Sequence, residues 1–131
     1  MPPGRKRRGE ESARERGLTQ AWETLIPLLV HMQANLDGDL GLTAISRRAR
    51  MSPFHLQRTF KAAVGETPKV HASRLRLERA AFQLLIHDAK VLDIALECGY
   101  RSHETFTRAF RRCFGRSPSE YRETVRNGAR R

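Results

Sequence analysis

Hydrogen-bonding side chains gather on the outward faces of two predicted helices, one that begins after Ser52 and one that begins after Ser102. The residues on these faces are Phe54, Gln57 and Arg58 in the first helix and His103, Glu104, Thr107 and Arg108 in the second. Amide and guanidinium groups pair bidentately with the edges of adenine and guanine, and an aromatic ring suits a thymine methyl group. These residue types on one helical face are suited to reading base edges. An ordinary solvated face is the alternative reading for each.

The two helices belong to an internal repeat with a period of 50 residues. Residues 52–68 align with residues 102–118 without a gap, with identities at Ser52/Ser102, Arg58/Arg108, Phe60/Phe110, Gly65/Gly115 and Pro68/Pro118. Repetition at a constant period indicates one structural unit used twice. A short helix and a turn precede each copy, so the sequence predicts two helix-turn-helix units.

Burial of apolar residues at helical spacing would turn these two faces toward solvent. They recur every four residues, as Leu56, Phe60 and Val64 in the first helix and Phe106, Phe110 and Phe114 in the second. Ser52 and Ser102 are predicted N-caps, and Gly65 and Gly115 are predicted to end the helices.

The rest of the chain also reads as helical, which gives an all-α fold of about seven helices. Thr19 is a predicted N-cap for a helix that carries Trp22, Leu25, Leu29, Met32 and Leu36. Pro27 makes this either a kinked helix or a turn followed by a helix. Further helices are predicted over Leu42–Ala49, about Pro68–Ile86, about Val91–Cys98 and from Pro118 to Val125.

The predicted domain boundaries follow from these elements. Residues 1–17 are charged and nearly free of apolar side chains, so we expect a disordered basic tail, whose Arg5–Arg8 run either touches DNA phosphate or has no role. Residues 18–125 form the DNA-binding domain, with a first helix-turn-helix unit at 18–67, a connecting helix at 68–87 and a second unit at 88–125. Residues 126–131 form a frayed basic tail.

The composition favours a polyanionic partner. The 131 residues contain 25 Lys and Arg against 14 Asp and Glu, a net charge of +11. Such a charge suits nucleic acid or an acidic membrane surface, although a basic surface kept for solubility is the simpler alternative. No apolar run approaches the roughly 18 residues of a membrane span, and no apolar stretch follows the basic N-terminus as in a secretory signal. We therefore expect a cytoplasmic, nucleoid-associated protein with no membrane partner.

Cysteine and histidine do not indicate a metal site, a cofactor or an enzyme. Cys98 and Cys113 each lie on or beside an apolar helical face, and both are predicted to be small buried residues in a reducing compartment. Neither has a general base or zinc-ligand spacing beside it, which argues against an alkyl-transfer enzyme. The five histidines lack the spacing of a metal-binding helix.

From about Ile26 to Val125 the chain resembles the DNA-binding region of the AraC/XylS family of bacterial transcription regulators. The matching motifs are Ile94-Ala95, Gly99-Tyr100-x-Ser102, Phe106-x-x-x-Phe110, Phe114-Gly115-x-x-Pro118-x-x-Tyr121-Arg122, Arg76–Ala80 and His55–Lys61. The resemblance implies two helix-turn-helix units joined by a long helix, promoter binding and recruitment of RNA polymerase. It also implies base contacts from Phe54, Gln57, Arg58, His103, Glu104, Thr107 and Arg108.

Three residues depart from the family pattern. Arg50 stands where the first turn usually has glycine, and His71 replaces a usual aromatic residue. Glu104 either accepts a hydrogen bond from cytosine or only offsets nearby arginines.

The sequence therefore predicts a sequence-specific transcription regulator, with activation favoured, that binds double-stranded DNA as a monomer through an asymmetric site. The predicted phosphate contacts are Ser52, Lys61, Ser102, Arg111, Arg112 and Arg116. The alternative is a basic helical protein-interaction module with only non-specific DNA binding. Regulation is either by amount or by a sensing domain that this chain does not include.

Overall fold

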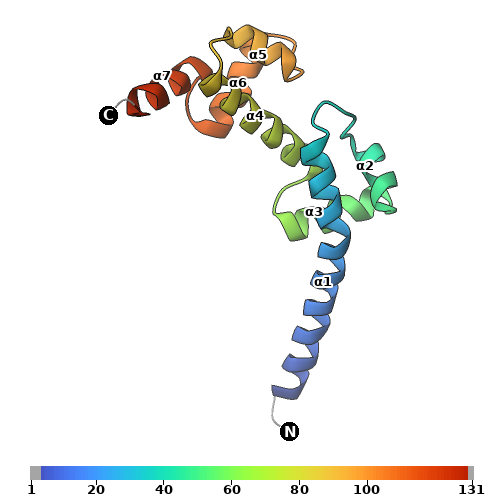
Figure 1. Ribbon diagram of the computed structural model, residues 1–131. Helices are drawn as coiled ribbons and strands as arrows, with labels where there is room; N and C mark the ends of the chain where they lie inside the picture. Colours follow the sequence, from blue (N-terminus) through green and yellow to red (C-terminus); the bar gives the residue numbers. More distant parts are fainter. Residues whose placement is uncertain (1–3, 130–131) are drawn as a thin grey trace. The chain divides into compact units, whose positions relative to one another are not determined.

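The computed structural model describes residues 4–129 and the side chains of residues 12–128 (Figure 1). Over these residues the chain forms seven helices and no strand, which confirms the predicted all-α class. The helices are α1 (Gly4–Ala34), α2 (Leu42–Ala49), α3 (Pro53–Val64), α4 (Pro68–Ile86), α5 (Val91–Glu97), α6 (His103–Phe114) and α7 (Pro118–Ala129).

The chain divides into two compact units, Met1–Ala72 and Ser73–Arg131. The division falls inside α4, whose first residues belong to the first unit and whose remainder belongs to the second. The predicted connecting helix, residues 68–87, is present as α4, and the division falls within it. Each helix-turn-helix is therefore completed by a part of α4.

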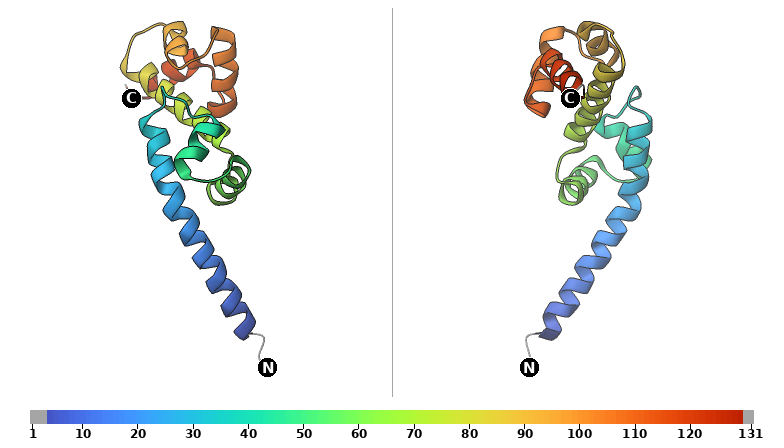
Figure 2. Two further views of the ribbon diagram at one scale, coloured as in Figure 1. Left: turned by 90° about the vertical axis from the view of Figure 1, so that its right-hand side faces the viewer. Right: turned by 60° about the vertical axis from the view of Figure 1, so that its left-hand side comes forward.

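The first unit packs α2 and α3 against the C-terminal half of α1 (Figure 2). Its buried core includes Leu25, Leu28 and Met32 from α1, Ile45 from α2, and Leu56 and Phe60 from α3. His71 closes this core, because its ring meets Phe60 edge-on at a centroid distance of 5.4 Å. His71 Nδ1 lies 2.8 Å from Glu66 Oε1. The imidazole ring of His71 thus packs against Phe60 at the position where the family pattern has another aromatic residue.

Helix α1 corrects two expectations about the N-terminal segment. It begins at Gly4, so residues 4–17 are helical and not disordered, while residues 1–3 and the side chains of Arg5–Arg8 lie outside the described parts. Thr19 is not an N-cap, because it lies inside the helix and its hydroxyl donates to the Glu15 carbonyl at 2.8 Å. The physical reason is that Arg, Lys, Glu and Ala are good helix formers, so the helix continues beyond its packed part without a core.

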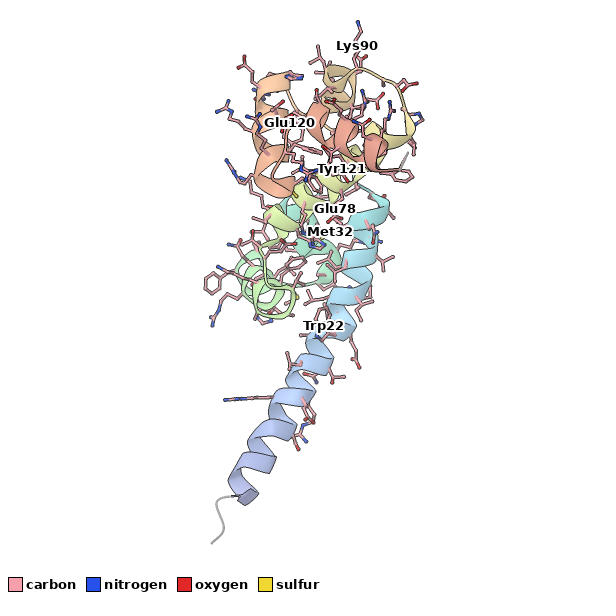
Figure 3. The ribbon with its side chains drawn as sticks, turned by 90° about the vertical axis from the view of Figure 1, so that its left-hand side faces the viewer. Trp22, Met32, Glu78, Lys90, Glu120 and Tyr121 are labelled. Carbon is pink, nitrogen blue, oxygen red and sulfur yellow. The ribbon has the colours of Figure 1, made fainter. Side chains whose placement is uncertain are left out.

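Helix α1 is also continuous through Pro27, which excludes the alternative of a turn followed by a separate helix. The described side chains from Ser12 to Gln20 are all exposed. Within the first unit no other helix lies beside α1 ahead of Trp22, whereas Met32 is fully buried (Figure 3). Packing therefore fixes only the C-terminal half of this helix.

The second unit packs α4, α5, α6 and α7 around an aromatic core. Its buried residues are Leu77, Ala80, Ala81, Leu84, Ile94, Ala95, Cys98, Phe106 and Phe110. Tyr100 meets Phe106 edge-on at 5.3 Å, and Tyr121 meets Phe110 edge-on at 5.4 Å. Burial raises the pKa of the Tyr100 hydroxyl above its ordinary value of 10.0, so this hydroxyl is neutral at physiological pH.

Cys113 corrects the prediction that both cysteines are buried. Cys98 is buried in the core of the second unit, as predicted, but Cys113 is exposed. On α6 the inward positions are taken by Phe106, Phe110 and the half-buried Phe114. Residue 113 stands at the edge of this stripe and turns to solvent.

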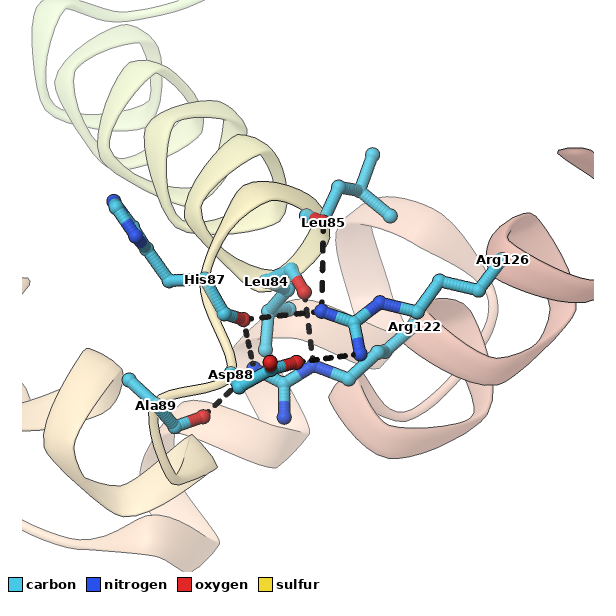
Figure 4. Close-up of polar contacts among 7 residues, drawn as sticks. All are labelled: Leu84, Leu85, His87, Asp88, Ala89, Arg122 and Arg126. Carbon is cyan, nitrogen blue, oxygen red and sulfur yellow. Dashed lines mark hydrogen bonds and ion pairs between the residues drawn. The ribbon is translucent and has the colours of Figure 1, made fainter.

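Two arginines of α7 hold the C-terminal end of α4 (Figure 4). Arg122 donates to the carbonyls of Leu84 at 2.8 Å, His87 at 3.2 Å and Ala89 at 2.7 Å. Arg126 donates to the His87 carbonyl at 3.2 Å, and its other terminal nitrogen lies 2.9 Å from Asp88 Oδ1. No glycine ends α4, so these guanidinium groups satisfy carbonyls that the helix end leaves open.

The predicted basic tail, residues 126–131, is therefore wrong for its first part. Helix α7 runs to Ala129, since Arg126 is tied to the end of α4, and residues 130–131 lie outside the described parts. None of the described helices is long and apolar enough to cross a membrane.

Candidate nucleic-acid interface

Helix α3 is fixed at both ends by the predicted signals. The Ser52 hydroxyl oxygen accepts a hydrogen bond from the His55 backbone N–H at 3.2 Å, and Pro53 occupies the first helical position. Gly65 ends the helix with a φ of 92°. Because serine caps the free N–H groups and glycine adopts the left-handed conformation without strain, the helix has defined limits and a defined phase.

The outward side of α3 carries all the predicted base-reading residues of the first unit. Leu56 and Phe60 are fully buried, which turns Phe54, Gln57, Arg58 and Lys61 to solvent. Phe54 is 71% exposed, a large apolar ring with little contact to the protein. The Arg58 guanidinium carbon lies 5.5 Å from the centroid of that ring. A cation–π contact of this kind orients the guanidinium group without neutralising it.

Helix α6 has the same construction in the second unit. The Ser102 hydroxyl oxygen accepts from the Thr105 backbone N–H at 3.1 Å, and Gly115 ends the helix with a φ of 74°. Phe106 and Phe110 are fully buried. The four predicted base-reading residues come together on the outward side, where His103, Glu104, Thr107 and Arg108 line one shallow surface depression.

Polar contacts among these four residues are few. Thr107 Oγ1 lies 3.4 Å from His103 Nδ1, a long contact that leaves both groups able to bind elsewhere. In the described part of the chain, Glu104 forms no ion pair with an arginine. The carboxylate is therefore placed to accept a hydrogen bond from a ligand that lies against α6.

The predicted phosphate-binding residues differ in how far they are already engaged. Lys61, Arg112 and Arg116 are exposed. Ser52 and Ser102 use their hydroxyl oxygens as helix caps, and the Ser102 hydroxyl also lies 2.6 Å from the Thr105 hydroxyl.

Arg111 is paired within the protein. Its guanidinium group donates to Glu120 Oε1 at 3.3 Å, and the two side chains are 60% and 58% exposed. Such an exposed ion pair contributes little to stability. A phosphate can therefore replace Glu120 as the partner of Arg111.

The two turns differ by one residue, which the period of 50 does not reveal. The N–H groups of Arg50 and Gly99 each donate to the carbonyl three residues earlier, at 3.2 and 3.0 Å. The next N–H in each turn donates to the carbonyl five residues earlier, at 3.0 Å in both. Arg50 and Gly99 are thus equivalent, with an offset of 49, and Arg101 is an additional residue before Ser102. Arg50 does occupy the glycine position, with a φ of 56°.

Comparison with known proteins decides the family. A family model described as a helix-turn-helix domain matches residues 45–124. Regulatory protein SoxS of Escherichia coli is 34% identical over 98 residues, which cover 75% of this chain and 92% of SoxS. An AraC-type transcriptional regulator from Chromobacterium violaceum superposes with a TM-score of 0.74 at 28% identity, over 80% of this chain and 94% of that one. The chain belongs to the AraC/XylS family.

Two further relatives of this AraC/XylS-family chain bear on DNA binding. Right origin-binding protein of Escherichia coli is 36% identical over 97 residues, and the chain spans about a third of its length (74% of this chain, 34% of that protein). The DNA-binding domain of AdpA, solved in complex with a target DNA, superposes with a TM-score of 0.66 at 30% identity, over 85% of this chain and 95% of that one. The family's DNA-binding region is therefore present here with both of its helix-turn-helix units.

Proposed function

We propose that this chain is a sequence-specific, DNA-binding transcription regulator that inserts α3 and α6 into successive major grooves of one duplex. The observation that carries the proposal is the common construction of the two helices. Each has a capping serine, two fully buried apolar residues four positions apart and an exposed face of groups that suit base edges. Such a face on a rigid helix is what direct readout of base pairs requires.

The roles of individual residues follow from their chemistry. Gln57 suits adenine, Arg58 and Arg108 suit guanine, and Glu104 suits the cytosine amino group. Phe54 suits a thymine methyl group, and His103 and Thr107 complete the second face. Phosphate contacts that fix the register come from Ser52, Lys61, Ser102, Arg111, Arg112 and Arg116.

The two faces differ in their residues, so the proposed binding site is asymmetric. Major grooves on one face of the duplex recur at about 34 Å, so a complete site covers roughly two helical turns. Since one chain carries both reading helices, it binds as a monomer.

Helix α5 carries a surface that suits a protein partner and not DNA. Its exposed side presents Leu92, Asp93, Leu96 and Glu97. The equivalent positions on α2, at the offset of 49, are Thr43, Ala44, Arg47 and Arg48. An acidic and apolar face in a chain of net charge +11 repels phosphate and fits a partner with a basic and apolar surface. We propose RNA polymerase as that partner, and activation as the regulatory outcome.

Selection of binding sites from a random duplex pool, at two salt concentrations, tests the proposed function. We expect a strong asymmetric motif with two half-sites about one helical turn apart. A flat pool with a steep salt dependence would contradict specific recognition. That outcome would favour a basic protein-interaction module, which the net charge of +11 also allows.

A further inference from the structure

Arg50 occupies a conformation that normally belongs to glycine. In the described part of the chain it is the one residue other than glycine with a positive φ, at φ 56° and ψ 38°. A side chain in the left-handed region is crowded against its own backbone, which costs stability. The equivalent turn of the second unit closes with the same two hydrogen bonds around Gly99. The turn itself therefore does not require a side chain at this position.

Two further arginines precede Arg50 closely in the chain. Arg47 and Arg48 lie in the last turn of α2, and with Arg50 they form an exposed group that we call the turn arginines. In the described part of the chain, the Arg50 side chain makes no hydrogen bond or ion pair. Its guanidinium group is thus available to an anion from outside the protein.

The segments that span α2 to α3 and α5 to α6 differ in charge, although units 18–67 and 88–125 as a whole each carry a net charge of +1. Residues 42–65 contain five Lys and Arg and no Asp or Glu, a net charge of +5. Residues 91–115 contain four Lys and Arg and three Asp and Glu, a net charge of +1. The positions equivalent to the turn arginines are Leu96, Glu97 and Gly99. The second unit therefore has no arginine at these three positions, and its turn carries a single exposed arginine, Arg101.

We infer that the turn arginines form a phosphate-binding site, centred on Arg50, on the DNA strand that borders the groove entered by α3. The inference rests on the proposed function. Arg50 precedes the capping Ser52 by two residues, so its Cα lies within about 8 Å of the Ser52 Cα. A guanidinium group binds two phosphate oxygens in parallel and remains charged at all physiological pH values.

The turn arginines add phosphate contacts to the first unit. The first unit supplies a salt-dependent share of the affinity through the turn arginines together with Lys61. The second unit has proposed phosphate contacts of its own from Arg111, Arg112 and Arg116, and the carboxylate on its reading face contributes discrimination between sequences. The strain at Arg50 is then a loss of stability that the phosphate contact offsets when DNA is bound.

The variant Arg50→Gly tests the inference, because the proposed role and a structural role predict opposite effects. Arg14→Ala is the charge-matched control, since Arg14 is an exposed arginine of α1 in the same unit. Affinity is measured over a salt series on a random-sequence duplex and on a duplex from the selected pool, and thermal unfolding is measured on the free protein. We expect Arg50→Gly to unfold at a higher temperature and to bind both duplexes about three- to tenfold more weakly. We also expect it to lower the slope of log K against log salt by about 0.9, whereas Arg14→Ala leaves the slope unchanged.

Two further variants separate the charge from the backbone. Arg50→Lys keeps the charge and the strained backbone, so it should bind within about twofold of the original protein. Arg50→Gln keeps the strain without the charge, so it should bind as weakly as Arg50→Gly.

The inference is overturned if Arg50→Gly binds like Arg14→Ala. It is equally overturned if Arg50→Gly unfolds at a lower temperature, because the guanidinium group would then serve the carbonyls at the end of α2. If the pool yields no specific site but Arg50→Gly still weakens random-duplex binding, the proposed function fails and the phosphate site stands.

Discussion

At the scale of single residues, the outward side of α3 separates base readers from phosphate binders one helical turn apart. Replacing Arg58 with alanine should cost about 1–3 kcal/mol of binding free energy on the selected duplex and relax the preference at particular base pairs. Replacing Lys61 with alanine should weaken binding to every sequence alike and flatten the salt dependence. Affinities on selected and scrambled duplexes measure both effects. An equal loss on the two duplexes for Arg58→Ala would remove its assigned role.

The stacking of Arg58 on Phe54 gives a second prediction at this scale. The guanidinium carbon lies 5.5 Å from the ring centroid, so the exposed ring holds the arginine ready to bind. A double-mutant cycle on DNA affinity, with Phe54→Leu and Arg58→Ala, should show a coupling of about 0.5–1 kcal/mol, because leucine keeps apolar area without the π face. Additive effects, within about 0.3 kcal/mol, would show that the ring and the guanidinium group act independently.

At the scale of elements, the second unit depends on how α7 holds the end of α4. Arg122→Ala removes three hydrogen bonds to carbonyl oxygens and should lower the free energy of unfolding by about 2–3 kcal/mol. Arg126→Ala is the matched control. Arg126 donates longer hydrogen bonds to the His87 and Leu85 carbonyls and pairs with the exposed Asp88, so its replacement should cost less, about 1 kcal/mol. Urea unfolding followed by circular dichroism measures both, and equal losses for the two variants would contradict the assigned role of Arg122.

The same elements show which structural features can be predicted from the sequence and which cannot. Helices α3 and α6 could be placed closely, since a capping serine, an apolar residue every fourth position and a terminal glycine are all local signals. The start of α1 and the end of α7 could not. Residues 4–17 form helix by propensity without a core, and the partners of Arg126 lie 39 residues earlier in the chain. The one-residue difference between the turns was hidden because Ser52 and Ser102 still align at a period of 50.

For the candidate interface, the sequence predicts which residues face outward but not which of them already have a partner within the protein. Every predicted base-reading residue lies on the outward side of its helix, because the buried phenylalanines fix the helical phase. That Arg111 is already paired with Glu120 depends on the packing of α7 beside α6, which no local pattern encodes. The exposure of Cys113 depends likewise on Phe114 taking the inward position.

At the scale of the whole molecule, the exposed charged side chains of α2 and α3 are basic and those of α5 are acidic. Residues 42–65 carry a net charge of +5, yet α5 turns two carboxylates and two leucines outward. Charge of the wrong sign for DNA lowers affinity for phosphate, so such a face is expected only where another partner compensates for it. DNA binding and transcription should therefore be separable by mutation.

The double variant Asp93→Asn/Glu97→Gln tests this separation. The amides nearly keep the size of the side chains while removing both charges, so DNA affinity should be unchanged or slightly higher. If the charges contribute about 1.4 kcal/mol to a polymerase contact, transcription from a reporter promoter should fall about tenfold. The control is Glu15→Gln/Glu23→Gln, which removes the same charge from an exposed part of α1 and should leave transcription unchanged. Footprinting and transcription with purified polymerase give the two measurements on one template. Full transcription by the α5 variant would show that α5 carries no polymerase contact, and an equal loss in the control would assign the effect to total charge.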